Sequence, residues 1–174
     1  MVTQYYTASS LDGFIATKDN SLEWLFRQDI DLEGPMAYPE FGKEKGALVM
    51  GATTYEWILG NHETWDYTSP TWVFTHRELP AKSGGGDVHL TQAPVAEVHR
   101  EMTEAAAGKN IWIVGGGDLV GQFADEGLLD EVWVQYAPVT LGSGAPLLPR
   151  ELDLELVEVA RNRDFMCGRW SVVR

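Results

Sequence analysis

Three consecutive glycines lie between an apolar segment and a segment with helical spacing, in the stretch IWIVGGGDLVGQF at residues 111–123. A strand that ends in glycines and opens a helix exposes unpaired backbone N–H groups and the positive end of the helix dipole, and this arrangement binds phosphate groups. Gly115, Gly116 and Gly117 are therefore candidate ligands for an anion. They are equally compatible with a tight strand-to-helix turn that binds nothing.

The common phosphate-binding fingerprints do not fit this stretch. The dinucleotide fingerprint of the Rossmann fold requires a glycine three positions after Gly117, where Val120 stands instead. The phosphate-loop pattern that ends in Gly-Lys-Ser/Thr is absent from the sequence. The glycines therefore predict neither of these two classes of nucleotide-binding protein.

A second strand-to-helix junction repeats the arrangement in the stretch LVMGATTYEW at residues 48–57. The predicted strand ends at Gly51, and the hydroxyl groups of Thr53 and Thr54 stand where the next helix begins. In a parallel sheet the carboxyl ends of the strands lie at one edge, and ligands bind there. Two such junctions predict a site that holds two parts of one long anionic ligand.

A third predicted strand, in the stretch VFTHR, ends in the polar residues Thr75, His76 and Arg77. The guanidinium group of Arg77 is a cationic fork suited to a phosphate monoester, and Thr75 adds a hydroxyl donor beside it. Taken singly, such an arginine is more often a surface residue than a ligand. Because it follows a third polar strand end, we predict that Arg77 binds the ligand.

The surrounding segments predict a mostly parallel sheet with crossover helices. Strand-like and helix-like segments alternate from residue 46 to about residue 138, which is typical of parallel strands joined by helices. The tail at residues 151–174 reads as two strands with a turn near residues 162–164. It predicts an antiparallel hairpin at one edge of the sheet. The stretch KSGGGD at residues 82–87 predicts a turn.

The composition predicts one folded domain over residues 1–174 and excludes several classes of protein. A net charge of −13, with thirteen scattered Lys and Arg residues, argues against binding to nucleic acid or to membranes. The N-terminus shows no basic start followed by a long apolar run, so we expect a cytoplasmic protein. The single Cys167 excludes an intrachain disulfide, and the four histidines fall in no ligand spacing, so no metal site is predicted.

The ordered set of motifs resembles the dihydrofolate reductases and their relatives. VMGATTYEWI is similar to their Met-Gly-x-x-Thr-Trp/Tyr-Glu segment, IWIVGGGDLVGQF to their Val-x-Gly-Gly-Gly segment, and SLDGFIA to their opening strand and turn. VTLGSGAPLLP is more similar to a sister branch, the stand-alone riboflavin-biosynthesis reductases of the RibD C-terminal domain type. The resemblance extends from Tyr5 to about Pro149.

This resemblance implies an α/β protein with the three-layer α/β/α fold of dihydrofolate reductase, built on a twisted, mostly parallel eight-stranded sheet. It implies an NADPH-dependent reductase that transfers a hydride to a small pterin-like or pyrimidine-like heterocycle, or to a carbonyl compound. It also implies a homodimer, which the apolar tail strands support because they would otherwise leave an exposed sheet edge.

The resemblance assigns the cofactor-binding residues by position. The opening strand and its turn would lie beside the nicotinamide, the second junction beside the ribose and phosphates, the VFTHR segment around the adenosine 2′-phosphate, and the glycine stretch along the pyrophosphate. A cis peptide is expected between the first two glycines of that stretch. The predicted set is Ala8, Ile15, Ala16, Gly51, Thr53, Thr54, Thr75, His76, Arg77, Val114, Gly115, Gly116, Gly117, Asp118, Leu119 and Val120.

The resemblance leaves the proton donor open among Glu23, Tyr136 and a bound water. Folate reductases carry an acid on the helix after a flexible loop. The corresponding loop here, TKDNSLEWLFRQ, is shorter, and it places Glu23 nearest in sequence, with Trp24 as the alternative occupant of that position. Glu23 also suits the first turn of an exposed helix.

The substrate and the activity also stay open. A riboflavin-type substrate carries a phosphate and would need basic residues around the open face, for which the candidates are Lys18, Arg27, Arg161 and Arg163. An alternative to the reductase is a nucleotide-binding protein that retains the cofactor cleft without turnover, as a sensor or a structural dimer. A third reading is an α/β scaffold that binds no ligand.

Overall fold

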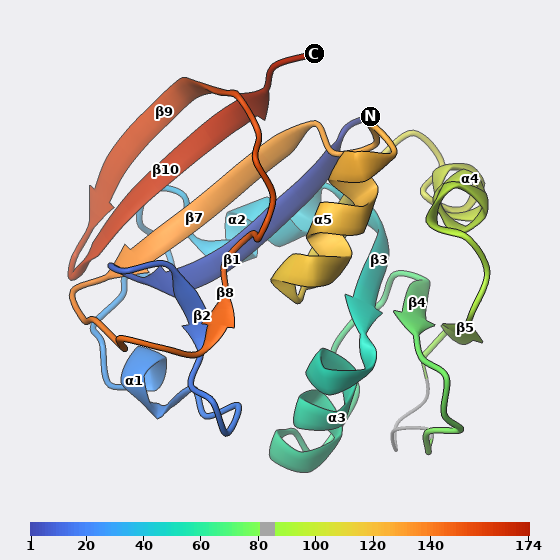
Figure 1. The fold of residues 1–174 in the computed structure, drawn as a ribbon, viewed down its shortest axis with the longest axis horizontal. Coiled ribbons are helices and arrows are strands. Elements are labelled where there is room, and N and C mark those ends of the chain that lie inside the picture. Colours follow the sequence, from blue (N-terminus) through green and yellow to red (C-terminus); the bar gives the residue numbers. More distant parts are fainter. Residues whose placement is uncertain (81–85) are drawn as a thin grey trace.

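A single eight-stranded sheet forms the centre of the computed structural model, which describes residues 1–80 and 86–174 (Figure 1). Neighbouring strands from one edge to the other are β5 (Val88–Thr91), β4 (Thr71–Phe74), β3 (Lys45–Gly51), β6 (Asn110–Gly115), β1 (Thr3–Ser10), β7 (Glu131–Ala137), β10 (Phe165–Val172) and β9 (Leu154–Asn162). The first six in this order run parallel, whereas β10 pairs antiparallel with both β7 and β9. The predicted mostly parallel sheet is confirmed.

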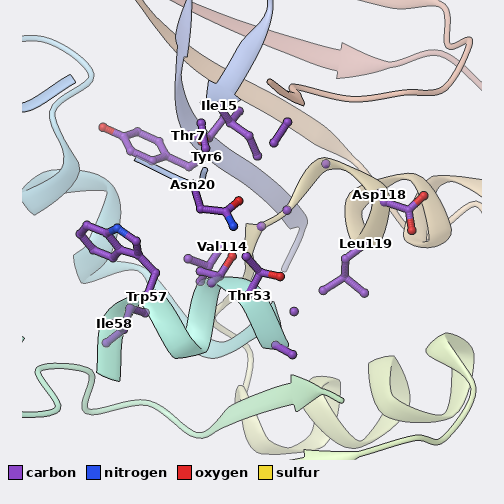
Figure 2. Close-up of a pocket in the computed structure, with 18 of the residues that line it drawn as sticks. Tyr6, Thr7, Ile15, Asn20, Thr53, Trp57, Ile58, Val114, Asp118 and Leu119 are labelled. Carbon is purple, nitrogen blue, oxygen red and sulfur yellow. The ribbon is translucent and has the colours of Figure 1, made fainter. Parts of the chain in front are cut away.

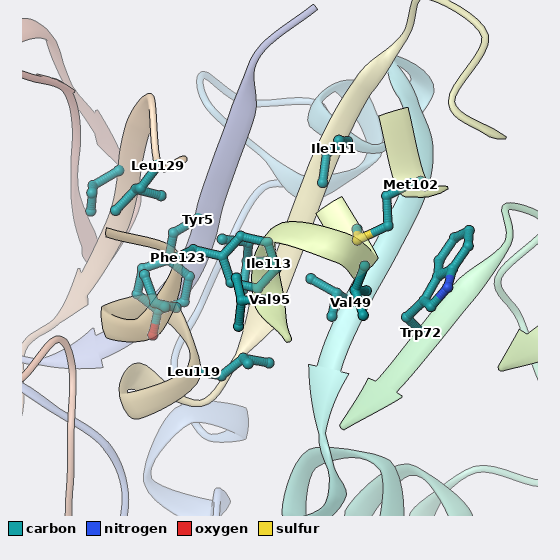
Figure 3. Packing of buried hydrophobic residues seen from close by; sticks show 14 of the residues in the cluster. Tyr5, Val49, Trp72, Val95, Met102, Ile111, Ile113, Leu119, Phe123 and Leu129 are labelled. Carbon is teal, nitrogen blue, oxygen red and sulfur yellow. The ribbon is translucent and has the colours of Figure 1, made fainter. Parts of the chain in front are cut away.

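Helices cover both faces of this sheet because successive strand residues alternate between two apolar surfaces. On one face, α4 (Val95–Ala105) and α5 (Gly117–Asp125) pack against a cluster that includes Tyr5, Ile111 and Ile113 (Figure 3). On the other face, α2 (Tyr38–Lys43) and α3 (Ala52–Asn61) pack against the intervening residues, among them Tyr6 and Trp112. The three-layer α/β/α arrangement is therefore confirmed.

The C-terminal hairpin closes one edge of the sheet, as predicted. Asn162 at the end of β9 pairs with Phe165 at the start of β10, so the chain turns through Arg163 and Asp164. Arg163 adopts a φ of 49°, in the left-handed region that tight turns use. Strand β9 is the last strand of the sheet, so one of its two edges pairs with no strand in the described part of the chain.

Several short elements were not predicted from the sequence. They are α2 and a two-stranded sheet of β2 (Phe14–Ala16) and β8 (Ala145–Pro146). Gly144 makes this small sheet possible, because its φ is +147° and a side chain there would overlap the carbonyl oxygen of Ala16. Helix α1 (Glu23–Phe26) carries the exposed Glu23 in its first turn, as the sequence suggested. The turn predicted at residues 82–87 falls largely outside the described residues. Within residues 1–80 and 86–174, no helix has the length and apolarity that a membrane span requires.

Candidate functional site

A cleft of about 1130 Å³ opens where the parallel strands end. Its walls include Ala8 near the end of β1, Gly51 at the end of β3, Phe74 at the end of β4 and Gly115 at the end of β6. This volume exceeds the range of about 300–1,000 Å³ that is usual for a single drug-sized ligand. The cleft therefore has room for a dinucleotide together with a second small molecule.

Two helix N-termini meet at this cleft. Helix α3 begins after Gly51 and helix α5 after Gly116, and neither helix has a side-chain hydrogen bond at its N-cap. The two junctions touch, since a methyl group placed on Gly51 would lie 3.8 Å from the carbonyl oxygen of Gly115. Uncapped first-turn N–H groups and the positive ends of two helix dipoles favour an anion at this point.

The three consecutive glycines are needed for different reasons. Gly115 has a φ of +142° and forms a cis peptide bond with Gly116, as the resemblance implied. A side chain at Gly116 would extend into the cleft, where the nearest protein atom is Cδ1 of Ile15 at 3.7 Å. A side chain at Gly117 would overlap the backbone carbonyls of Pro146 and Leu147. The protein itself therefore leaves space for a side chain at Gly116, whereas the packing of the chain requires glycine at Gly117.

The opposite end of the cleft is aromatic. Figure 2 shows Tyr6 and Trp57 at this end, while Asp118 and Leu119 lie at the helix-terminus end. Phe26 stacks on Trp57 with 5.9 Å between the ring centroids. The full set of aromatic side chains at this end is Tyr6, Phe26, Tyr38, Trp57, Tyr67 and Trp112. Flat apolar surfaces of this kind bind planar rings.

The tyrosines at the aromatic end carry their protons at neutral pH. Burial raises the pKa of Tyr67 to about 12. Burial also raises the pKa values of Tyr6 and Tyr38, because the charged phenolate loses solvation. Their hydroxyl groups are therefore neutral, and that of Tyr6 donates a hydrogen bond to the carbonyl oxygen of Met36 at 3.1 Å.

The strand end predicted to bind a phosphate monoester lies partly in the cleft. Thr75 and His76 line it, but Arg77 does not. The guanidinium group of Arg77 donates two hydrogen bonds to the carboxylate of Glu56 on α3, at 3.0 and 2.8 Å. The Nδ1 atom of His76 lies 3.3 Å from Oε1 of Gln92. Arg77 would need to exchange or share its carboxylate partner in order to contact a ligand.

Most of the predicted cofactor-binding residues lie together along the cleft. Arg77 and Val120 are the two that do not line it, and Val120 is fully buried on α5 in the core. The residues that line the cleft are Ala8, Ile15, Ala16, Gly51, Thr53, Thr54, Thr75, His76, Val114, Gly115, Gly116, Gly117, Asp118 and Leu119.

The two predicted proton donors lie away from the cleft lining. Glu23 is exposed in α1, and Trp24 beside it is buried among core residues. Tyr136 faces the other side of the sheet, where its ring meets Trp170 edge-on. The structure therefore does not bring either side chain into contact with the space that a ligand would occupy.

Five carboxamides that line the cleft were missed from the sequence, among them those of Asn20, Gln28 and Gln135. Gln135 precedes Tyr136 in β7, and because strand residues alternate between faces, the strand places Gln135 on the cleft side instead. Gln135 could have been identified only by knowing which face of β7 meets the cleft.

The fold and the cleft define an α/β protein with the dihydrofolate-reductase-like architecture. A solved protein from Shewanella sp. PV-4, whose name places it in riboflavin biosynthesis, superposes over 100% of both chains with a TM-score of 0.84 and 25% identity. A pyrimidine reductase-like protein from Corynebacterium diphtheriae has a TM-score of 0.68 over 99% of this chain and 92% of its own, at 13% identity, and so shares the fold.

The chain belongs to the RibD C-terminal domain family, whose model matches residues 60–165. The uncharacterized protein YwjB of Bacillus subtilis is 36% identical over 149 residues, which cover 83% of this chain and 81% of YwjB. The riboflavin biosynthesis protein RibD of Corynebacterium ammoniagenes is 26% identical over 162 residues, covering 83% of this chain but 45% of RibD. The predicted family is therefore confirmed.

Proposed function

We propose that this protein is an NADPH-dependent reductase of a small pyrimidine-like heterocycle. The observation that carries the proposal is the pair of adjacent, uncapped helix N-termini in a cleft that continues into an aromatic end. The first feature suits the phosphates of a dinucleotide, and the second suits a planar ring. Membership of a reductase-containing family supports the same activity.

The residues of the cleft fit NADPH. The first-turn amides of α3 and α5 would hold its phosphates, and the open space beside Gly116 leaves room for close approach to the backbone. Ala8, Ile15 and Ala16 would border the nicotinamide, because they line the cleft between its two ends. When bound, NADPH supplies a hydride from its nicotinamide ring.

The protein's own part in the reaction is to orient two rings and exclude water. Ile15 and Val114 supply apolar walls near the middle of the cleft (Figure 2). Neither Glu23 nor Tyr136 lines the cleft, so we assign the proton to a water molecule rather than to either of these side chains. Preorganised walls of this kind lower the barrier to reaction by holding the two rings in position.

The adenosine 2′-phosphate would lie at the strand end that contains Thr75 and His76, with Arg77 turning from Glu56 to reach it. In the Glu56→Gln variant the guanidinium loses its charged partner, so we expect NADPH to bind about threefold or more tightly while NADH changes little. In Arg77→Ala we expect NADPH to bind about tenfold more weakly, because a charge-assisted contact contributes about 1.5–3 kcal/mol. Calorimetric titration of both nucleotides measures the two effects. An equal change for NADPH and NADH in either variant would contradict this placement.

A second candidate is a nucleotide-binding protein without turnover, acting as a sensor or a structural dimer. It is favoured by the position of Glu23 and Tyr136 away from the cleft lining. Both candidates require NADPH binding, and they differ in whether any heterocycle or carbonyl compound causes NADPH oxidation.

We also propose that the protein forms a homodimer through the outer edge of β9. This strand has no neighbour on that edge among the described residues, and it exposes Leu156, Val157 and Val159. Two copies of an edge strand can pair antiparallel about a twofold axis, which would cover these side chains.

If β9 forms the dimer interface, the wild type and a variant that blocks pairing of β9 should differ twofold in mass. We expect the wild type to sediment with twice the chain mass of 19.4 kDa and Val159→Lys to sediment as a monomer, because a lysine on an edge strand opposes pairing. The control Glu158→Gln changes the neighbouring position, which faces the other side of the strand, without introducing a lysine, and should sediment like the wild type. A wild-type monomer would contradict the dimer.

A further inference from the structure

We infer that the second ligand of the cleft is an uncharged, planar nitrogen heterocycle that carries no phosphate group. The inference rests on the proposed function in assigning the helix-terminus end to the cofactor, which leaves the aromatic end for the second ligand. Its basis is the combination of aromatic rings, carboxamide groups with free acceptor atoms, and the absence of Lys and Arg from the cleft lining of the described residues.

No Lys or Arg side chain lines the cleft within residues 1–80 and 86–174. Lys18 and Arg27, two of the predicted phosphate ligands, are exposed and do not line the cleft. Arg161 and Arg163 border a different surface hollow, beside Pro138. The described part of the cleft lining therefore offers no Lys or Arg partner to a phosphate.

The two arginines of that hollow already have partners. The guanidinium of Arg163 pairs with the carboxylate of Asp29 at 2.9 Å. The Nε atom of Arg161 donates to the carbonyl oxygen of Arg163 at 2.9 Å. Both interactions hold the side chains at the β9–β10 turn.

An acidic group lies beside the aromatic end. Asp66 lies 3.6 Å from His62, which lines the cleft, and its negative charge acts on both Tyr38 and Tyr67. A carboxylate repels an anion, and a phosphate loses its hydration on entering an apolar cleft. The field at this end therefore opposes a phosphorylated ligand.

Three carboxamides supply the polar contacts that a neutral heterocycle requires. The Nε2 atom of Gln135 donates to the carbonyl oxygen of Met36 at 2.7 Å, which fixes the amide and leaves its Oε1 atom without a partner among the described residues. Gln28 is held likewise through the carbonyl oxygen of Trp24 at 2.7 Å. The side-chain amide of Asn20, near Ile15 and Val114 in Figure 2, has no hydrogen-bond partner among the described residues. Such groups match the ring N–H and carbonyl groups of a pyrimidine or a pteridine.

Uracil, uridine and uridine 5′-monophosphate test the inference, because they share one ring and the last two differ only in the phosphate. Trp57 and Trp112 line the cleft, so quenching of tryptophan fluorescence reports binding. We expect uracil and uridine to bind saturably and uridine 5′-monophosphate to bind at least tenfold more weakly than uridine. Equal or tighter binding of the phosphorylated probe would overturn the inference, and so would the absence of uracil binding.

A matched pair of variants locates the binding. Gln135→Leu should weaken uracil binding about tenfold, and its fold should survive because the carbonyl oxygen of Met36 keeps its hydrogen bond from Tyr6. Gln122→Leu changes a glutamine at the helix-terminus end and should leave uracil binding unchanged. Equal effects of the two variants would place the probe elsewhere and overturn the inference.

Nicotinamide fluorescence of NADPH, measured on the same samples, separates the two proposals. Uracil binding without NADPH binding would contradict the proposed reductase and leave the ligand class supported. NADPH binding with a preference for the phosphorylated probe would contradict the ligand class alone.

Discussion

The Gly117→Ala variant should lose about 3 kcal/mol or more of its free energy of unfolding. The added methyl group would overlap the backbone carbonyl oxygens of both Pro146 and Leu147, and neither can move without shifting β8 and its pairing with β2. Overpacking against backbone is more costly than contact with a side chain, which can change its rotamer. Urea unfolding followed by far-UV circular dichroism measures the loss.

Gly121→Ala is the matched control in the same helix. A methyl group at Gly121 would meet the side chain of Arg150, which is flexible and can move aside. Alanine also favours a helix more than glycine by about 1 kcal/mol, so we expect a stability within about 1 kcal/mol of the wild type. If the two variants had equal stability, then the contact with β8 would not be the reason for glycine at Gly117.

The Thr53→Glu variant should bind NADPH at least tenfold more weakly than the wild type without losing stability. Thr53 is exposed in the first turn of α3 and lines the cleft. A carboxylate there would occupy the place proposed for phosphate and repel it. The same charge stabilises the N-terminus of the helix by about 0.3–1 kcal/mol, so stability should rise slightly.

Thr53→Gln isolates the charge from the size of the new side chain. Glutamine and glutamate have nearly the same shape, so any difference between the two variants measures electrostatic repulsion. We expect Thr53→Gln to bind NADPH within about threefold of the wild type. Calorimetric titration and thermal unfolding give the two quantities for each protein. Equal NADPH affinity of the Glu and Gln variants would exclude phosphate from the start of α3.

The order of the main elements could be predicted because each carries a local signal. The glycine at the end of β6 and the apolar spacing after it predicted α5, and the alternating tail predicted the hairpin of β9 and β10. These signals depend on residues close together in the sequence, so they can be recognised without knowledge of the tertiary structure.

The cleft was less predictable because its aromatic half depends on long-range packing. Helices α1 and α2 are short, and their place is set by contacts of Trp24 and Phe41 with residues far along the chain. The difference between Gln135 and Tyr136 depends on which face of β7 meets the cleft. The pairing of Arg77 with Glu56 likewise joins residues 21 positions apart, on different elements. No local pattern contains this information.

The central claim is that the two adjacent helix N-termini bind a dinucleotide, and calorimetric titration of the wild-type protein with NADPH and NADH tests it most directly. We predict that NADPH binds with one site per chain and at least tenfold more tightly than NADH, because the second nucleotide lacks the 2′-phosphate. A titration in which neither nucleotide binds would contradict the claim and leave the glycines of β6 and α5 as elements of the fold alone.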